Sequence, residues 1–238
     1  MERKILESIV KKIQKMKKKY LSLVIFSGGM DSSICLGLAK KKFGAANVLA
    51  LTYHYGQRHE MEVRQSKKIA KYFGVDHKIM ELDFLSKVGV NALTNKKMKI
   101  KSGVNGSAPN TMVMGRNGLF AMVGSMVANE VGATSLWMGV MGLEGANSGY
   151  RDCSPEYIKL MENIIRIDIG NLRFNIYTPL IKMTKKETMG VADKLGVLPY
   201  LLDHTVSCYK GIMKKGCGKC PACKLRNEGI KEYLNINI

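Results

Sequence analysis

The 238-residue sequence has no apolar run long enough to cross a bilayer, and it has no internal repeats and no low-complexity linkers. Residues 1–4 also lack the apolar region that begins a signal peptide. These absences exclude repeat architectures and predict a soluble cytoplasmic protein with no membrane association. A chain of this length suits one domain with a substantial core and a small appendage.

Acidic residues are scarce, with 19 Asp and Glu against 38 Lys and Arg, which gives a formal net charge of +19. Such an excess can bind the phosphates of a nucleic acid. A solvated, lysine-rich surface explains it better, because net charge bears on solubility and association rather than on fold. The charge alone therefore does not establish a nucleic-acid partner.

Cysteine is also scarce, and most of it is clustered. Four of the six cysteines form a C-x8-C-x2-C-x2-C pattern: Cys208, Cys217, Cys220 and Cys223. Four thiolates in a short, glycine-containing segment match a closed tetrahedral structural zinc site and not a disulfide framework. A four-thiolate iron–sulfur cluster is the alternative. The upstream position of the fourth ligand and the absence of the usual Cys-Pro ending favour zinc.

The segment over residues 23–32 predicts a phosphate-binding loop. A short apolar strand runs into the turn Gly28-Gly29, and a helix begins near Asp31 and Ser32. The free amides of that helix start converge with the hydroxyls of Ser27 and Ser32 on one spot. The GxxxxGK[ST] spacing of a Walker loop is absent. The alternative is a Gly-Gly turn in a nucleotide-free fold, which the Ser, Gly-Gly, Asp-Ser order disfavours.

The rest of the chain alternates strands with helices. Residues 49–54 read as a second buried strand, and residues 55–59 follow it at its carboxyl end, where α/β sheets bind ligands. Residues 118–131 form an apolar helix, and residues 135–140 another strand. We expect a doubly wound parallel sheet with helices on both faces and a small zinc-binding lobe at the C-terminus.

Six motifs occur in a characteristic order: SGGxDS, YGQRH, PNTxVxGRN, SGYxDC, TPL followed by KxE, and the four-cysteine loop. From about residue 23 to residue 234 this order resembles the 7-cyano-7-deazaguanine synthase (QueC) family. SGGxDS itself resembles the pyrophosphate loop of the N-type ATP pyrophosphatases, the PP-loop superfamily. The resemblance implies an adenine nucleotide alpha hydrolase-like, Rossmann-like fold, ATP as co-substrate with magnesium, a structural zinc and a homodimer.

The activity that the resemblance implies is that of an AMP-forming ligase. It would adenylate the carboxylate of 7-carboxy-7-deazaguanine, let ammonia displace AMP to form an amide, and use a second ATP to form the nitrile. The product, 7-cyano-7-deazaguanine, is the precursor of queuosine or archaeosine.

The resemblance also implies roles for individual residues. The residues expected to bind pyrophosphate and its magnesium are Ser27, Gly28, Gly29, Asp31 and Ser32. Adenine is expected to contact the backbone near Thr52 and Tyr53. The catalytic residues are expected to be Arg116 and Lys185, which would stabilise the charge that develops during transfer. The alternative is that both are ordinary charged surface residues without a catalytic role. The residues expected to bind the 7-deazapurine are Arg58, Asn117, Tyr150 and Asp152. We expect an amphipathic basic helix over residues 1–20, the ATP-binding domain over 21–200 and the zinc lobe over 201–238.

Three departures from the family pattern keep alternatives open. Residues 141–147 replace a short acidic loop and keep only Glu144 as an acid, and Met114 stands where the family usually has Pro. The third is the helix over residues 1–20, which would pack on the domain or a dimer partner, or else dock a protein or nucleic acid.

One alternative function is that of a defence-associated branch that stops at the amide or modifies a protein amine.

Another alternative is a tRNA-modifying PP-loop enzyme that transfers sulfur. The zinc cage would use four cysteines, while Cys35 reads as a buried helix residue and Cys153 as part of the family pattern, so no cysteine is left for a persulfide. A binding module without catalysis is disfavoured by the intact phosphate loop.

Overall fold

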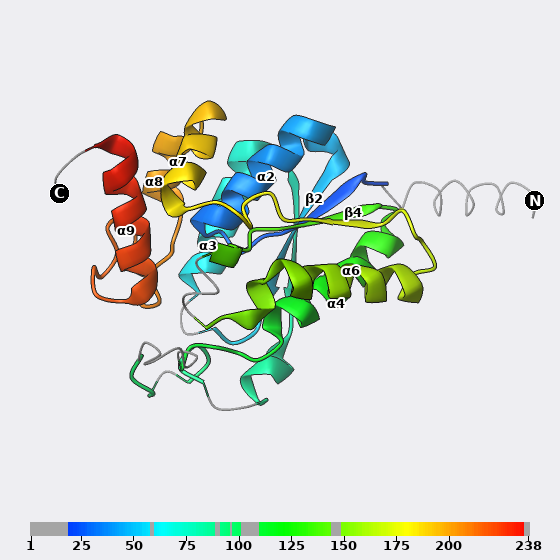
Figure 1. Ribbon diagram of the computed structural model, residues 1–238, viewed down its shortest axis with the longest axis horizontal. Helices are drawn as coiled ribbons and strands as arrows, with labels where there is room; N and C mark the ends of the chain where they lie inside the picture. The colour runs from blue at the N-terminus through cyan, green and yellow to red at the C-terminus, as the bar shows by residue number, and fades with distance from the viewer. Residues whose placement is uncertain are drawn as a thin grey trace, which may run out of the picture.

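The computed structural model (Figure 1) describes residues 19–57, 60–88, 91–95, 97–100, 110–143 and 149–235. Nearly all of the helix predicted over residues 1–20 lies outside these ranges, as do Arg58 and residues 144–147 of the altered loop. Within the described ranges, no helix combines the length and the apolar character needed to cross a membrane.

A five-stranded parallel sheet with the order β3-β2-β1-β4-β5 forms the centre of the protein. Its strands are β1(Ser22–Ile25), β2(Val48–His54), β3(Asp76–Glu81), β4(Ser135–Met138) and β5(Asn175–Tyr177). Leu23 of β1 pairs with Leu49 of β2 on one side and with Leu136 of β4 on the other. The chain builds outward from β1 to β3 and then returns to β4, which confirms the doubly wound arrangement.

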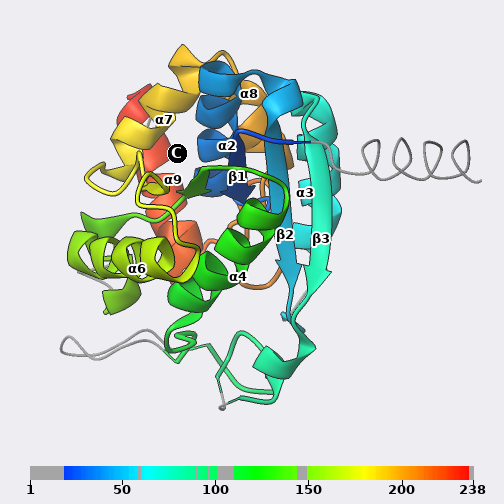
Figure 2. The ribbon, with the colours of Figure 1, turned by 90° about the vertical axis from the view of Figure 1, so that its right-hand side faces the viewer.

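Helices cover both faces of the sheet (Figure 2). One face packs against α2(Met30–Phe43), α3(Met61–Phe73), α7(Lys185–Lys194) and α8(Leu198–His204), and the other against α4(Arg116–Glu130) and α6(Pro155–Asp168). Side chains alternate between the two cores: Val24 belongs to the first and Leu23 to the second. Both are fully buried, as expected for strands covered on both faces.

Short 3-10 turns connect several elements: η1(Ala45–Asn47), η2(Asp83–Ser86) and η3(Arg151–Cys153). The last helix, α9(Pro221–Leu234), follows the cysteine loop and packs on the outside of α7. There the hydroxyl of Tyr233 donates to Asp193 at 2.8 Å. The division into parts at residues 20 and 200 stays a prediction.

Two predicted boundaries differ slightly from the structure. The apolar helix begins at Arg116 rather than at residue 118, and β4 ends at Met138 rather than at residue 140. The last residue of β1, Ile25, pairs with Met138, so β4 has no further β1 residue to pair with. Beyond this point Gly139 turns against the phosphate loop.

Candidate functional site

The phosphate loop lies at the carboxyl end of β1, where the chain reverses its direction across the sheet between β1 and β4. Ligands bind doubly wound sheets at this switch point. The loop is closed by its own serines: the Ser27 and Ser32 hydroxyls are 3.0 Å apart, and the Gly29 amide donates to Ser27 Oγ at 3.2 Å. The helix α2 begins directly after the loop, and the amides of a helix's first turn have no hydrogen-bond acceptor within the helix itself. Binding of an anion at these amides stays a prediction.

Two glycines allow backbones to meet at the loop. Gly28 has φ +81°, and a Cβ there would lie 2.7 Å from the Glu62 carbonyl oxygen and 2.9 Å from the Ser66 amide nitrogen. A Cβ on Gly139, just after β4, would lie 2.7 Å from the Ser32 amide nitrogen. Side chains at either position would push α3 or β4 away from the loop.

Replacing Gly28 by alanine is expected to destabilise the protein by more than about 2 kcal/mol, because it adds a backbone collision to the cost of a positive φ. Gly74→Ala is the matched control, since Gly74 has φ +66° with no atom within 4 Å of the added Cβ. It should cost only about 1 kcal/mol. Chemical denaturation of both variants gives the comparison, and equal losses would contradict the collision.

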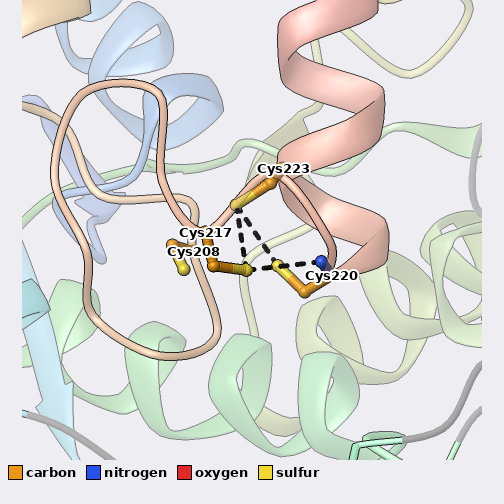
Figure 3. A group of neighbouring side chains, drawn as sticks. All are labelled: Cys208, Cys217, Cys220 and Cys223. Carbon is orange, nitrogen blue, oxygen red and sulfur yellow. Dashed lines mark hydrogen bonds between the residues drawn. The ribbon is translucent and has the colours of Figure 1, made fainter.

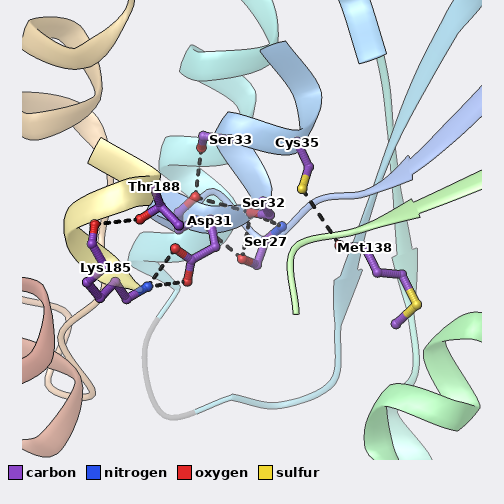
Figure 4. Close-up of polar contacts among 9 residues, drawn as sticks. Ser27, Asp31, Ser32, Ser33, Cys35, Met138, Lys185 and Thr188 are labelled. Carbon is purple, nitrogen blue, oxygen red and sulfur yellow. Dashed lines mark hydrogen bonds and ion pairs between the residues drawn. The ribbon is translucent and has the colours of Figure 1, made fainter. Parts of the chain in front are cut away.

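Lys185 reaches the loop from α7. Its Nζ donates to both carboxylate oxygens of Asp31 at 2.6 Å, and Figure 4 shows the two side chains pointing toward each other. Lys185 is buried, with 9% of its surface exposed, whereas 28% of the Asp31 side chain is exposed. This ion pair places a cation and a carboxylate beside the amides at the start of α2.

A capping box fixes the start of α7 and with it the position of Lys185. The Thr184 hydroxyl accepts from the Glu187 amide, and the Glu187 carboxylate accepts from the Thr184 amide at 2.7 Å. Lys185 is therefore the first residue of a firmly capped helix. Of the two residues in the KxE motif, Lys185 points to Asp31 and Glu187 caps the start of the helix.

Thr52 and Tyr53 lie at the same edge, beyond the end of β1, whose last paired residue, Ile25, faces Leu51. The Thr52 hydroxyl donates to the Phe26 carbonyl, and the Tyr53 ring stacks on Phe120 with 4.5 Å between centroids. Both side chains are thus engaged within the protein, which leaves any adenine contact to the backbone. That role stays a prediction.

A cluster of polar side chains surrounds Arg116 at the start of α4. Burial would lower the pKa of Arg116, but four neighbours outweigh it and raise that pKa above its usual value: Tyr55, Asp152, Tyr150 and Glu62. The four come from three places in the chain: Tyr55 follows β2, Glu62 starts α3, and the other two lie at η3, about 90 positions further on. The fold therefore gathers a permanently charged guanidinium and two carboxyl groups at one place.

Asp152 holds the N-terminus of α4. Its Oδ2 accepts from the Asn117 amide at 3.1 Å, so the anion that meets this helix start is the protein's own carboxylate. The residue is 9% exposed, and its Oδ1 has no hydrogen-bond partner among the residues that the structure describes. A buried acceptor of this kind calls for a donor from a ligand or water.

Tyr150 and Asn117, which were both predicted to bind the substrate, complete this group. The Tyr150 hydroxyl lies 2.7 Å from Thr111 Oγ1, and the Asn117 side-chain amide donates to Cys153 Sγ at 3.3 Å. Arg116, Asn117, Tyr150 and Asp152 thus lie together, and Arg58 lies outside the described residues. Their contact with a substrate stays a prediction.

Glu62 was not predicted as a site residue, yet it connects the two groups: its carbonyl lies against Gly28, and its carboxyl is near enough to Arg116 for the two to interact electrostatically. Burial raises the pKa of Glu62 from 4.5 to about 7, although Arg116 opposes the shift. Between pH 4.5 and about 7 the Glu62 carboxyl therefore keeps its proton in the folded protein and loses it in the unfolded chain. Stability therefore falls as the pH rises through this window.

Glu62→Gln is accordingly expected to stabilise the ligand-free protein above pH 7 relative to the wild type, by on the order of 1 to 3 kcal/mol, and to lose this advantage near pH 4.5. Melting temperatures of both proteins from pH 4.5 to 8.5 check this. A difference that stays constant with pH would contradict the raised pKa.

The four predicted cysteine ligands come together after α8 (Figure 3). Their sulfur atoms all lie within 4.8 Å of one another, with 3.9 Å between Cys217 and Cys223 and 3.3 Å between Cys220 and Cys223. A tetrahedral zinc with Zn–S bonds of about 2.3 Å separates its sulfurs by about 3.8 Å, so the group fits. A Cβ on Gly216 would collide with Cys223 Sγ, which explains a glycine there.

The other two cysteines do not suit sulfur chemistry. Cys35 is fully buried in α2, as predicted, and burial raises its pKa above the usual value. Burial also raises the pKa of Cys153, to about 11. A thiol in such a setting stays protonated and is a poor nucleophile.

Comparison with known proteins agrees with this architecture. Residues 21–234 match the family described as Queuosine biosynthesis protein QueC. The 7-cyano-7-deazaguanine synthase of Lysinibacillus sphaericus is 40% identical over 92% of this chain and 97% of that protein. The enzyme of the same name from Staphylococcus epidermidis is 42% identical over 91% of this chain and 94% of its own length.

A solved structure, the NMN synthetase from Francisella tularensis, has the same fold. It aligns with a TM-score of 0.50 over 95% of this chain and 81% of its own, at 12% identity, so the likeness concerns fold alone. With the family match covering most of the chain and relatives at about 40% identity, the chain belongs to the QueC family of queuosine biosynthesis proteins.

Proposed function

We propose that the protein is an ATP-dependent C–N ligase that converts 7-carboxy-7-deazaguanine and ammonia to 7-cyano-7-deazaguanine through an adenylated carboxylate and an amide. The observation that carries this proposal is the position of Glu62. Its carbonyl lies beside Gly28, and its carboxyl is near enough to Arg116 for the two to interact electrostatically, so the residues proposed for the nucleotide adjoin those proposed for the substrate. The names of the relatives supply the substrate class.

In the first step the substrate carboxylate attacks the α-phosphorus of ATP, and pyrophosphate leaves. The amides after β1 and the Lys185 ammonium would hold the leaving pyrophosphate, while Arg116 would neutralise charge on the transferring group. Asp31 suits magnesium, since this ion commonly binds one carboxylate together with substrate phosphates and neutralises their charge.

In the second step ammonia attacks the acyl adenylate, and AMP leaves to give the amide. The amide oxygen then attacks a second ATP, again releasing pyrophosphate. Loss of AMP and a proton from this intermediate leaves the nitrile. Two ATP are consumed and two AMP appear for each nitrile.

The 7-deazaguanine ring would lie beside Tyr150 and Asp152. The unpartnered Oδ1 of Asp152 is a buried acceptor, and the guanidine-like edge of this ring offers N–H donors. The four cysteines would hold zinc in a closed structural site, because all four positions of a tetrahedron are then filled by protein ligands.

Mass spectrometry of products from 7-carboxy-7-deazaguanine labelled with ¹⁸O in its carboxylate tests the proposal, in the presence of ATP, magnesium and ammonium. The expected result is unlabelled nitrile with one ¹⁸O in each of two AMP. An amide endpoint with one labelled AMP would favour the branch that stops early. Absence of turnover by folded, ATP-binding protein would contradict the proposed substrate.

We also propose a homodimer in the cytoplasm. On α6, the side chains of Leu160, Ile164 and Ile167 share one face at helical spacing and are exposed, which offers an apolar surface for self-association. Light scattering after size exclusion measures the mass in solution.

A further inference from the structure

A chain of hydrogen bonds reaches the phosphate loop from β3, the strand at one edge of the sheet. The Nε2 of His77, on β3, lies 2.8 Å from the hydroxyl oxygen of Thr52, on β2. That hydroxyl donates to the carbonyl of Phe26, the residue immediately before the loop. The two side chains share one face of the sheet, because His77 pairs in register with Ala50, two residues before Thr52. The chain therefore crosses β2 and ends where β1 passes into the loop.

The chemistry of these groups fixes the direction of the chain. A carbonyl oxygen only accepts, so the single hydroxyl proton of Thr52 is used on Phe26, and the hydroxyl oxygen accepts from His77. Burial, with a smaller effect of Lys67, lowers the pKa of His77 to about 4, so the imidazole is neutral at pH 7. Its one N–H proton therefore lies on Nε2. The Phe26 ring packs edge to face on this imidazole, with 5.9 Å between centroids.

The peptide bond between Phe26 and Ser27 carries the chain into the loop. Its carbonyl accepts from Thr52, and its amide donates to Ser32 Oγ at 3.2 Å. The Ser32 hydroxyl donates in turn to the Gly29 carbonyl at 3.1 Å, and Figure 4 shows the contacts between Ser27 and Ser32. All these protons are donated in one direction, and hydrogen bonds in such a series polarise one another. Side chains thus hold both edges of the first peptide plane of the loop.

We propose that His77 is a positioning residue of the ATP site, which acts through Thr52 to hold the Phe26–Ser27 peptide in the orientation that the phosphate loop needs. This inference rests on the proposed function. Thr52 also begins the backbone stretch predicted to contact adenine, so one hydrogen-bond chain holds that stretch and the loop relative to each other. A loop that is already ordered loses less conformational entropy when ATP binds, which favours affinity.

The test is the affinity for ATP with magnesium, measured by calorimetry without the carboxylate substrate. His77→Met removes the donor and is expected to weaken ATP binding about fivefold, the usual effect of one lost hydrogen bond. Thr52→Val removes both hydrogen bonds of the hydroxyl and should weaken ATP binding more than about tenfold. The KM for ATP should rise in parallel, while the KM for 7-carboxy-7-deazaguanine stays close to that of the wild type.

Two further variants separate this hydrogen bond from general stability. His77→Gln can place an amide N–H near the position of the imidazole Nε2–H, and it should recover most of the wild-type affinity. Ser135→Ala is the matched control, because the buried Ser135 hydroxyl donates to the Leu21 carbonyl at 3.3 Å, between neighbouring strands at the amino end of the sheet. It should lower the melting temperature and leave ATP affinity unchanged.

The double variant His77→Met with Thr52→Val shows whether the two residues act together. It should bind ATP hardly more weakly than Thr52→Val alone, because His77 acts through that hydroxyl. The role of His77 would be overturned by unchanged ATP affinity in His77→Met, by no recovery in His77→Gln, by additive losses in the double variant, or by an equal loss in Ser135→Ala. If the wild type itself binds no ATP, the proposed function fails and this inference with it.

Discussion

Lys185→Met is expected to lower the rate of pyrophosphate release at least a hundredfold. The ammonium lies 2.6 Å from both oxygens of Asp31, beside the amides that would bind the leaving pyrophosphate. A fixed cation in a poorly solvated site commonly contributes about two to three orders of magnitude when charge develops in the transition state. Methionine keeps the apolar stem and removes only the charge.

Exchange of labelled pyrophosphate into ATP, in the presence of the carboxylate substrate, measures this step. Lys186→Met is the matched control, since the neighbouring lysine is exposed, and it should retain near wild-type exchange. The loss of Lys185 also leaves Asp31 without its partner, so melting temperatures are compared. A folded Lys185→Met protein that exchanges pyrophosphate within threefold of wild type would refute the assigned role.

Cys220→Ser is expected to abolish metal binding and to lower the melting temperature by more than about 10 °C. Cys220 is buried with its sulfur 3.3 Å from that of Cys223. Binding of structural zinc releases about 10 to 16 kcal/mol in isolated zinc-finger peptides, and even part of this exceeds the usual effect of one mutation. One lost kcal/mol shifts the melting temperature of a chain of this size by about 2 to 4 °C.

Elemental analysis of the purified wild type should find one zinc per chain. Cys153→Ser is the control, because Cys153 lies outside the cluster and serine can keep the contact with Asn117. It should retain the metal. Iron in the wild type with strong visible absorption would instead identify an iron–sulfur cluster, and full zinc content in Cys220→Ser would refute the ligand set.

Local patterns predicted the parts of the site that lie within one stretch of chain. The strand, the Gly-Gly turn and the start of α2 are contiguous, as are three of the four cysteines, and their spacing is itself the signal. The alternation of strands and helices similarly predicted the parallel sheet. The family motifs predicted Asn117, Tyr150 and Asp152 as substrate-binding residues. Arg116 was predicted as catalytic together with Lys185, and its place beside Asp152 and Tyr150 comes from the structure.

Contacts between distant segments were beyond such patterns. Lys185 and Asp31 lie 154 positions apart, and no local feature indicates that the lysine points at that carboxylate. Gly139 resembled the last part of a strand, although its lack of a side chain lets β4 meet the phosphate loop. Glu62 lies in the first turn of α3 and was not predicted as a site residue, because its approach to Gly28 appears only in the folded chain.

The packing of α9 restricts how this protein can be recombined with its relatives. A Cβ on Gly229 would collide with the Cβ of Lys185, so the last helix lies directly against the backbone of the residue that pairs with Asp31. A chimera that exchanges everything after α8 would bring a foreign α9 to this contact. A successful exchange therefore has to carry α7 with the C-terminal lobe, or to keep glycine at the matching position.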